Sequence, residues 1–577
     1  MSHASSSNNR STADLLLEAL KEVGIDYLFS NLGTDHAPLI EALAERKLRD
    51  NQSPKIILCP HESTAAHMAG GYALVTGRGQ GILVHVDVGT ANAAIGMHNL
   101  FRSRIPAFLM AGKAPFTTHG EALGSRDNYV HFVQEPFDQA SLVRPYVKWE
   151  WTLPSGVVAQ QAIRRAHTIM QSEPKGPVYM MLPRETLGME LASDEIPSFS
   201  EENYGYVPPS GCDPNLVETL VKALMKARYP IILTSYAGRT EGASEAIDSV
   251  ARFAGIRVIE SNMVNNISHE SDCFSGFQAG PHLEQADFVL MVDTDVPWIP
   301  RDVKWREDVF RAQIDLDVLK VNSPLWSFPN QLRLQGNSAR ILQQLLLAVQ
   351  SQSTPSFEEG AKKRLSEISQ ERVKRVARSA EIAASPGEVD AINPHYLCRM
   401  LGQRIQPEDF IMHEAARNAP ALLQQIPRPI PGSLVRVAGG GLGASGGMAL
   451  GVKLARPQHL SLQILGDGSF YLNNPSSTFA VSKKYELPIF TIILDNGGWS
   501  AVKESTLRMY PDGQAKAMDA FEAELAQGVD FSKMIEGFGG YGELLTRPDR
   551  IEAALDRCLE TLRSGRAALL HVKVKRL

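Results

Sequence analysis

The sequence predicts an α/β protein with three doubly wound domains, each built on a parallel sheet. Three series of short apolar strands alternate with helical stretches along the chain, which is the pattern of βαβ units. A polar or proline-containing break follows each of the first two series, and 577 residues are enough for three or four domains of ordinary size. We therefore expect domains at residues 10–190, 205–350 and 395–577, with residues 351–394 as a linker.

The first domain is expected to open with an amphipathic helix. Ser11 or Thr12 is a suitable N-cap for it, and Gly24 is a suitable end. Leucine, alanine and valine recur on one face between these positions. Strands are expected at IDYLFS, KIILCP, GILVHVDVG, IPAFLMAG and PVYMMLP, with a helix over Ser63–Thr76.

The second and third domains repeat this alternation. The strands expected in the middle domain are PIILTSYAG, RVIES, FVLMVDTD and FRAQIDLD. The linker is polar and charged, and we expect it to be exposed and to carry one helix. The strands expected in the last domain are DFIMHEA, LSLQILG, IFTIILD and AALLHVKV, so the first and last domains are candidates for distant structural relatives.

Composition excludes several classes of function. The net charge is −6 and no basic stripe with interleaved aromatic residues is present, so nucleic acid is not an expected partner. Five scattered cysteines, without a CxxC pair, are typical of an intracellular protein with reduced thiols. No run of 18 apolar residues and no signal peptide is present, so no membrane association is expected. We expect a cytoplasmic location, and leave open an organellar or peroxisomal one, the latter because of the final Lys575-Arg576-Leu577.

Two turn segments provide oxygen ligands at the ends of consecutive strands. Asp467 lies in GDGS after one strand, and Asn496 lies in DNGG after the next. Ligands of doubly wound sheets bind beyond the carboxyl ends of the strands, so both side chains can meet one cation there. Mg²⁺ prefers a few protein oxygens together with phosphate oxygens and water. The alternative is that both segments are ordinary turns.

Two further segments are candidates for a cofactor site. Glu62 follows the strand KIILC and precedes the helix over Ser63–Thr76, where an acid also stabilises a helix N-terminus. A partly desolvated carboxylate with a raised pKa suits proton transfer. The glycine-rich run over residues 439–443 lets the backbone approach a ligand closely, or is only a flexible turn.

Together these segments resemble the signature of thiamine diphosphate (ThDP) enzymes. HESTAAHMAGGYA is similar to a segment of the ThDP-dependent decarboxylase and acetolactate synthase family, and GGGLGASGGMALG to one of the benzoylformate decarboxylases. GDGS with DNGG resembles the family's GDG…NN signature. The resemblance spans essentially the whole chain. It implies a pyrimidine-binding domain first, a central domain, and a diphosphate-binding domain last.

The resemblance implies a cofactor role for each of these residues. Glu62 would hydrogen-bond N1′ of the aminopyrimidine, Leu442 would hold ThDP bent, and the carbonyl of Gly440 would accept the 4′-amino proton. The metal ligands that it implies are Asp467, Asn496 and the backbone oxygen of Gly498. The residues expected near the diphosphate are Gly468, Ser469 and Arg417. Arg417 is alternatively an ordinary surface arginine.

The resemblance also has consequences for assembly. In this family Glu62 and Leu442 would come from different subunits, so we expect a homodimer as the minimum and a homotetramer as the assembly. One departure from the family pattern is Asp495, which replaces the first asparagine of the NN pair. The usual ligand is the second residue of that pair, so no metal ligand is lost.

Six residues are candidates for acid–base chemistry or the substrate pocket. His85 falls where benzoylformate decarboxylases carry an active-site histidine, and His36 lies with Thr34 in the first strand-to-helix loop. Each histidine is alternatively a core residue. Lys113 replaces the glutamine of the family's TGQ motif, and is either a cation for an anionic substrate or a solvated lysine. The remaining two are Gln134, in a segment similar to the family's FQE motif, and Trp499, directly after DNGG.

The function expected is ThDP- and Mg²⁺-dependent cleavage or formation of a bond next to the carbonyl of a 2-oxo acid. Acetolactate-synthase-like carboligation is the leading prediction. The alternatives are a benzoylformate-type decarboxylase, a hydroxyacyl or acyloin lyase, and a noncatalytic scaffold of the same fold. A dinucleotide-dependent oxidoreductase is disfavoured because GGGLGASGG lacks the downstream acid of such sites. The middle domain shows no flavin fingerprint, and FAD binding is left open.

Overall fold

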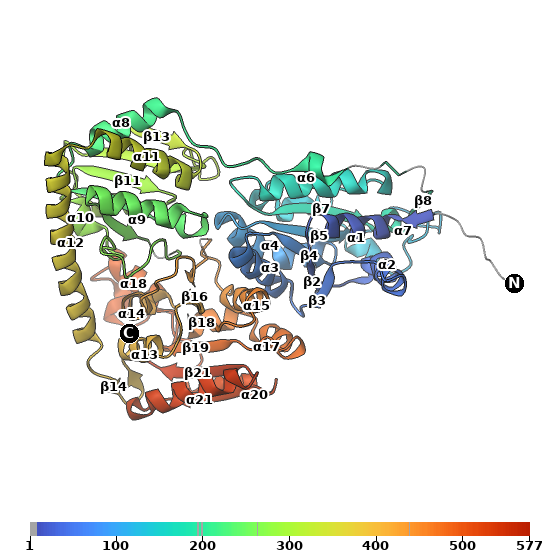
Figure 1. Cartoon of the computed structure of the whole chain (residues 1–577). Helices are drawn as coiled ribbons and strands as arrows, with labels where there is room; N and C mark the ends of the chain where they lie inside the picture. Colours follow the sequence, from blue (N-terminus) through green and yellow to red (C-terminus); the bar gives the residue numbers. More distant parts are fainter. Residues whose placement is uncertain (1–8, 193–195, 198–199, 262, 438, 577) are drawn as a thin grey trace.

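The computed structural model describes the chain except for residues 1–8, 193–195, 198–199, 262, 438 and 577. Three parallel sheets with helices around them confirm the three-domain α/β fold expected from the sequence. The first domain lies at the right of Figure 1, the central domain at the upper left, and the last domain at the lower left. In the described part of the chain, no helix combines the length and the apolarity needed to cross a bilayer.

The first and last sheets share one topology. The first runs in the order β3-β2-β4-β5-β7-β6 and the last in the order β17-β16-β18-β19-β21-β20, with every pairing parallel. Numbered within its own domain, each sheet has the order 2-1-3-4-6-5. The strands of the first sheet are β2 (Tyr27–Asn31), β3 (Lys55–Leu58), β4 (Gln80–Val84), β5 (Ala107–Lys113), β6 (Glu150–Thr152) and β7 (Val178–Pro183). The strands of the last sheet are β16 (Phe410–Glu414), β17 (Leu434–Val435), β18 (Ser461–Gly466), β19 (Phe490–Asp495), β20 (Tyr541–Leu545) and β21 (Ala568–Lys573).

Helices connect these strands and cover the faces of both sheets (Figure 1). Those of the first domain are α1 (Thr12–Glu22), α2 (Ala37–Leu48), α3 (Glu62–Thr76), α4 (Asp87–Arg102), α5 (Val130–Val133), α6 (Ala159–Gln171) and α7 (Arg184–Gly188). Those of the last domain are α13 (Pro394–Gly402), α14 (Ala419–Gln425), α15 (Ser445–Ala455), α16 (Asp467–Leu472), α17 (Pro475–Lys484), α18 (Ser500–Met509), α19 (Gln514–Ala517), α20 (Ser532–Glu536) and α21 (Ile551–Arg563). Ser11 caps α1 by accepting a hydrogen bond from Asp14 N–H at 3.1 Å, and Gly24 follows the helix with a φ of +81°.

The central sheet is also parallel, in the order β10-β9-β11-β12-β13. Its elements are β9 (Pro230–Thr234), β10 (Arg257–Glu260), β11 (Phe288–Val292), β12 (Phe310–Asp315), β13 (Leu332–Gln335), α8 (Pro214–Leu224), α9 (Ala243–Ala254), α10 (Gly280–Leu283) and α11 (Ser338–Gln352). Two short antiparallel pairs join β1 (Asn9–Ser11) to β8 (Glu190–Ala192) and β14 (Gly387–Glu388) to β15 (Ala391–Ile392).

The region expected as a linker contains the long helix α12 (Pro355–Ile382), which runs down the left side of Figure 1. Phe357, Ala361 and Ile368 of α12 are buried. Arg364 donates hydrogen bonds to backbone oxygens at the end of α9, including that of Ala254 at 2.7 Å. One face of α12 therefore packs against the central domain, while its other side faces solvent.

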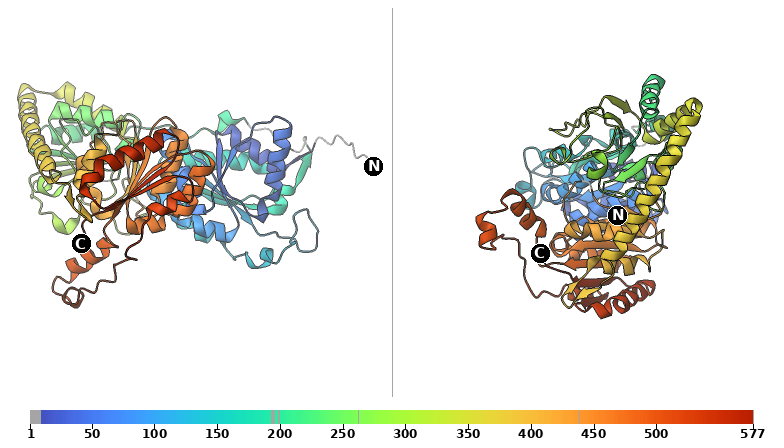
Figure 2. Two further views of the ribbon diagram at one scale, coloured as in Figure 1. Left: turned by 90° about the horizontal axis from the view of Figure 1, so that it is seen from below. Right: turned by 90° about the vertical axis from the view of Figure 1, so that its left-hand side faces the viewer.

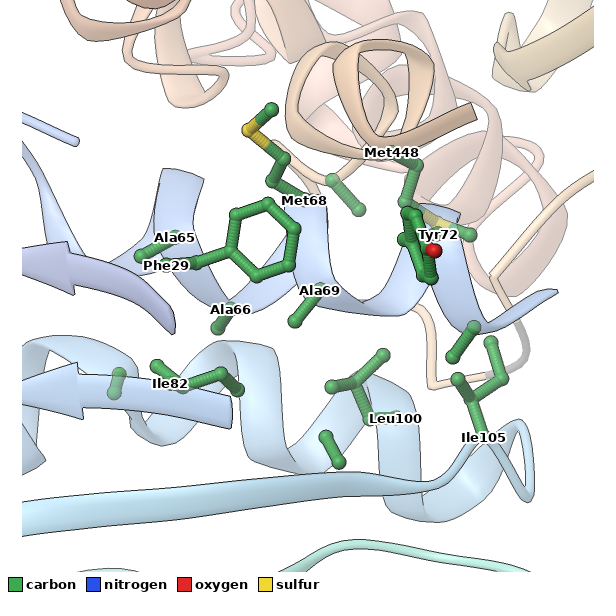
Figure 3. Close-up of a cluster of buried hydrophobic side chains, with 14 of the residues drawn as sticks. Phe29, Ala65, Ala66, Met68, Ala69, Tyr72, Ile82, Leu100, Ile105 and Met448 are labelled. Atoms are coloured by element: carbon green, nitrogen blue, oxygen red, sulfur yellow. The ribbon is translucent and has the colours of Figure 1, made fainter. Parts of the chain in front are cut away.

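Close contact between α3 and α15 joins the first domain to the last (Figure 3). Glycines permit it: a methyl group at Gly71 would lie 2.1 Å from the oxygen of Met448, and one at Gly451 would lie 2.0 Å from the oxygen of Met68. Around this contact, Met68 and Tyr72 pack with Met448 in one buried cluster that draws residues from both domains. The two sheets are thereby held in a fixed relation.

Candidate active site

The residues singled out in the sequence gather at the carboxyl edges of the first and last sheets. Strand order reverses between β2 and β4 in one sheet and between β16 and β18 in the other, and ligands bind at such switch points. The loops after β2 and β4 hold Thr34, His36 and His85. Asp467 begins α16 directly after β18, and Asn496 lies in the loop after β19. Each domain thus contributes one functional edge.

Three oxygen-bearing groups meet at the turn over residues 495–498, which is called the metal loop because it holds candidate Mg²⁺ ligands. One end of the Asn496 amide lies 3.0 Å from the backbone oxygen of Gly498 and 3.2 Å from Oδ1 of Asp467. A φ of +91° at Gly497 and +150° at Gly498 turns the backbone back toward Asp467, which only glycine does readily. Neighbouring ligands of an octahedral Mg²⁺ with bonds of about 2.1 Å are about 3 Å apart. With the amide oxygen at that end, these groups fit one Mg²⁺.

Asp495 supports the metal loop from behind. Its Oδ2 accepts hydrogen bonds from His571 Nε2 at 2.8 Å and from Lys573 Nζ, and its Oδ1 accepts from Gly497 N–H at 2.9 Å. Nδ1 of His571 accepts from Phe531 N–H at 3.2 Å, which leaves the ring proton on Nε2. Although burial raises it, the hydrogen bonds from His571 and Lys573 hold the pKa of Asp495 below its usual range. The departure from the NN pattern is therefore an ion-paired support for the loop.

Asp467 has a perturbed carboxyl group. Its side chain is buried at the start of α16, and burial, followed by the negative charge of Asp495, raises the pKa of Asp467 to about 6. A divalent cation at this position would favour the ionised carboxylate and offset both effects. The indole of Trp499 covers the neighbouring turn, since a methyl group at Gly468 would lie 2.5 Å from its ring. Ser469 Oγ donates to the backbone oxygen of Glu414 at 3.2 Å.

Glu62 is held at the start of α3 with little exposure. Its Oε2 accepts a hydrogen bond from Asn92 Nδ2 of α4 at 3.1 Å. The N-cap of α3 is His61, whose ring accepts from Ser63 N–H at 3.1 Å. Because His61 already caps the helix, the buried carboxylate of Glu62 is not needed for that purpose, which favours a role toward a ligand.

The glycine-rich loop presents Leu442. Asn99 of α4 donates to the oxygen of Gly441 at 2.8 Å and accepts from its N–H at 3.1 Å. Gly440 and Gly443 have φ values of +71° and +96°, so the chain turns on both sides of Leu442. The Leu442 side chain remains 37% exposed, although its neighbours are held. An exposed apolar side chain on a fixed loop suits contact with an apolar ring system.

Glu414, at the end of β16, is a positioning residue that the sequence analysis missed. Its Oε1 accepts from the N–H groups of Gly443 at 2.9 Å and Ala444 at 3.2 Å. Its Oε2 accepts from Ser445 N–H at 3.1 Å, from Ser445 Oγ at 2.7 Å and from Asn473 Nδ2 at 2.9 Å. The available signal was a lone acid at the end of the apolar strand FIMHE, because a buried carboxylate must find donors.

At the edge of the first sheet, His85 pairs with Asp35, a second residue that the sequence analysis missed. His85 Nδ1 lies 2.5 Å from Asp35 Oδ1, and Asp35 is 1% exposed. The hydrogen bond to Asp35 raises the pKa of His85, although burial opposes it, and Gln134 contributes a smaller increase. A methyl group at Gly112 would lie 1.2 Å from Asp35 Oδ2, so only glycine at the end of β5 leaves room for this carboxylate.

His36 and Thr34 have different surroundings. His36 is fully buried, and its Nδ1 accepts from Gly33 N–H at 3.0 Å while its Nε2 lies 3.6 Å from Asp35 Oδ2. Burial lowers the pKa of His36, so its neutral form is favoured. Thr34 is exposed, and its Oγ1 lies 3.4 Å from Nε2 of His131, whose pKa is also lowered by burial. His36 thus lies behind the pair of Asp35 and His85, called the dyad below, and Thr34 lies on the solvent-exposed side of that pair.

The two candidate cations differ in their surroundings. Lys113 ends β5 half-buried, and within the part of the chain that the structure describes no carboxylate lies within ion-pair distance of its Nζ. Arg417 lies in a short turn after β16 and forms an ion pair with Glu504 of α18. This favours Arg417 as an ordinary surface arginine over a phosphate ligand.

The central domain contains a separate cavity of 290 Å³ at the carboxyl ends of its strands. Leu233, Phe277 and Trp298 supply much of its apolar lining, and Thr234 and Glu260 are among its polar residues. Pockets for small organic ligands typically have volumes of about 300–1,000 Å³. The volume of this cavity lies at the lower end of that range.

Comparisons with known proteins agree with this architecture. Residues 10–142 match the model described as "Thiamine pyrophosphate enzyme, N-terminal TPP binding domain", and residues 422–572 match its "C-terminal TPP binding domain" counterpart. Thiamine pyrophosphate is another name for ThDP.

Similarity to individual relatives is low but extends over nearly the full length. The chain is 22% identical to the acetolactate synthase large subunit of Haemophilus influenzae, over 94% of this chain and 91% of that protein. It is 23% identical to a probable 2-ketoarginine decarboxylase of Pseudomonas aeruginosa, over 85% and 83% of the two chains. A solved structure, the ThDP-dependent 4-hydroxybenzoylformate decarboxylase of Rhodococcus jostii, superimposes with a TM-score of 0.77 at 19% identity, covering 98% of this chain and 100% of that one. The chain is therefore a member of the thiamine diphosphate-dependent enzyme family.

Proposed function

We propose that the protein is a ThDP- and Mg²⁺-dependent enzyme that decarboxylates a 2-oxo acid. The observation that carries this proposal is the approach of Asp467, Asn496 and Gly498 to distances that suit one Mg²⁺. In a ThDP enzyme this metal holds the diphosphate, so Gly468 and Ser469, at the start of the adjacent α16, are the residues proposed to lie nearest to it.

The cofactor would supply an electron sink for the carbonyl carbon that loses CO₂. Glu62 would hold a proton at the aminopyrimidine ring, which its limited exposure and its fixed position at the start of α3 favour. Leu442 and the carbonyl of Gly440 would fix the orientation of the same ring. Lys113, without a carboxylate partner among the described residues, suits an anionic substrate group. Thr34, Gln134 and Trp499 are proposed to line the remainder of the pocket.

After decarboxylation, two outcomes are chemically available. Carboligation with a second carbonyl compound, as in an acetolactate synthase, is supported by the nearly full-length similarity to acetolactate synthase large subunits. Release of an aldehyde, as in a benzoylformate-type decarboxylase, is supported by His85 at the edge of the first sheet. A hydroxyacyl or acyloin lyase would use the same residues. A noncatalytic scaffold is disfavoured, because Glu62, Leu442, Asp467 and Asn496 are all retained.

A homodimer is proposed as the smallest active unit, with a homotetramer as the larger assembly. Large apolar side chains are exposed around both functional edges, a feature typical of interaction surfaces. They include Phe116, Tyr129, Phe132, Phe137, Leu442, Tyr471, Trp499 and Met509. The segment with α18 and α19 also projects from the last domain (Figure 2), where a second copy would cover it. Light scattering of the purified protein would measure the assembly directly.

The test is CO₂ release from a panel of 2-oxo acids, including pyruvate and benzoylformate, with ThDP and Mg²⁺ present. The products would be identified by mass spectrometry, and Glu62→Gln would be compared with the parent at equal ThDP occupancy. Turnover that falls about 100-fold or more in Glu62→Gln would support the proposal. If ThDP and Mg²⁺ bind but no acid is decarboxylated, decarboxylation is wrong, and acyloins and hydroxyacyl thioesters are the next substrates to test.

A further inference from the structure

We propose that Asp35 is a positioning residue that makes His85 a fixed proton donor, so that the product of decarboxylation is an aldehyde. This inference rests on the proposed function and selects between its two outcomes. It comes from the pairing of two residues, 50 positions apart, at the switch point of the first sheet.

The hydrogen bond fixes which nitrogen of His85 is available. Nδ1 lies 2.5 Å from the buried Oδ1 of Asp35, and a carboxylate accepts, so the proton on Nδ1 is directed inward. The His85 side chain is 18% exposed while that of Asp35 is 1% exposed, which leaves Nε2 as the end of the ring directed toward the open edge. A carboxylate behind an imidazole orients it and stabilises its charged form, as in other acid–base pairs.

The charges around His85 favour its protonated form. The groups that face it are Asp35 and His36 from the loop after β2, Asp87 from α4, and Gln134 and His131 from the segment after β5. Two of these are carboxylates, whereas burial lowers the pKa of both neighbouring histidines. His85 therefore carries its proton over a wider pH range than its neighbours do.

The chemistry balances without a further reactant. In R–CO–COO⁻ + H⁺ → R–CHO + CO₂, the bond from the carbonyl carbon to the carboxylate breaks and its electron pair stays on that carbon. The proton on Nε2 of His85 forms the new C–H bond, and water returns a proton to Nε2. A carboligase must instead keep that carbon unprotonated until a second carbonyl compound arrives, which a fixed donor opposes.

The experiment measures CO₂, aldehyde and ligation product for the full chain with ThDP and Mg²⁺. The variants are Asp35→Asn, His85→Gln and the double variant, with Asp127→Asn as the control. Asp127 is an exposed carboxylate beside His131 and pairs with Arg184, so it matches the chemistry of Asp35 outside the dyad.

We expect wild type and the control to give mainly aldehyde. In Asp35→Asn the rate of aldehyde formation should fall about 10- to 100-fold, and its loss at high pH should begin at lower pH, because the protonated form of His85 is less favoured. The double variant should be no slower than His85→Gln, since Asp35 acts through that ring.

A second measurement does not need turnover. Diethyl pyrocarbonate reacts with neutral imidazole, and mass spectrometry reports modification of His85 at each pH, with the exposed His119 as an internal reference for the reagent. His85 of the apo protein should stay protected to higher pH in wild type than in Asp35→Asn. The same titration of wild type alone remains informative if Asp35→Asn fails to fold, because protection of His85 only at low pH would overturn the inference.

Two outcomes separate this inference from the proposed function. If wild type releases CO₂ and gives only a ligation product, or if the effects of the two substitutions add in the double variant, the role of Asp35 is wrong while decarboxylation stands. If wild type releases no CO₂ from any 2-oxo acid but His85 shows the Asp35-dependent protection, the proposed function fails while the dyad stands.

Discussion

The carboxylate of Glu414 accepts a hydrogen bond from the N–H of Gly443 at 2.9 Å, which joins the end of β16 to the loop that carries Leu442. Four further donors, from Ala444, Ser445 and Asn473, complete the set around the same carboxylate. One buried acid therefore fixes the end of the glycine-rich loop that leads into α15, while Asn99 holds Gly441 before it.

Replacing Glu414 with Gln should loosen this loop. The new amide NH₂ group faces donors in place of an acceptor, and each buried donor left unpaired costs about 1–3 kcal/mol. We expect ThDP affinity to fall at least about 10-fold and the thermal midpoint to drop. Fluorescence titration with ThDP measures the affinity, and thermal denaturation measures the midpoint. Glu536→Gln, at an exposed ion pair, is the control for both measurements. Unchanged affinity in Glu414→Gln would show that the loop does not depend on this acid.

Asp467→Asn and Asp495→Asn should have different effects, because Asp467 is a proposed metal ligand whereas Asp495 stabilises the loop beside it. Asp467 is proposed to bind Mg²⁺ directly, so its substitution should weaken Mg²⁺-dependent ThDP binding about 10-fold or more. Asp495 faces His571 and Lys573, so its substitution should lower thermal stability more than metal affinity. Calorimetric titration with Mg²⁺ at saturating ThDP distinguishes them. Equal losses of metal affinity would contradict this division of roles.

The ion pairing of Asp495 also predicts that the stability of the protein depends on pH. Because the folded-state pKa of Asp495 is held below its unfolded value, its stabilising contribution is present above that unfolded value of about 3.9, and is lost as pH falls through the folded-state pKa. Lys573→Met removes one partner, and we expect it to cost about 1.5–3 kcal/mol. The difference in thermal midpoint between wild type and variant should stay constant from about pH 8 to pH 5 and shrink below about pH 4. A difference that grows in acid would contradict the assignment.

The contact between α3 and α15 should not tolerate a methyl group. At Gly71 it would lie 2.1 Å from the oxygen of Met448, whereas at Gly280 it would meet nothing within 4 Å. We expect Gly71→Ala to destabilise the protein by about 1–3 kcal/mol through overpacking, and Gly280→Ala to be neutral or slightly stabilising. Thermal denaturation of the two variants makes the comparison. Equal midpoints would mean that the two domains separate easily at this contact.

The sequence alone was sufficient for the three-sheet fold and for placing Asp467 and Asn496 at the ends of neighbouring strands. Asp467 and Asn496 each sit directly after an apolar strand, so local pattern places them at a sheet edge. Asp35 could not be paired with His85 in this way, because the pairing depends on β2 lying beside β4. For the same reason the ion pair of Arg417 with Glu504, and the donors around Glu414, became visible only with the tertiary structure.

The shared strand order of the first and last domains has an evolutionary consequence. Equivalent positions, at the carboxyl ends of the first and third strands, hold the Asp35–His85 dyad in one domain and the Glu414 and Asp467 carboxylates in the other. The residues proposed for proton transfer and those proposed for metal binding thus lie in separate domains that share one strand order. Substitutions after β2 and β4 are therefore expected to change substrate choice or product without disturbing the proposed Mg²⁺ ligands, so the architecture is modular.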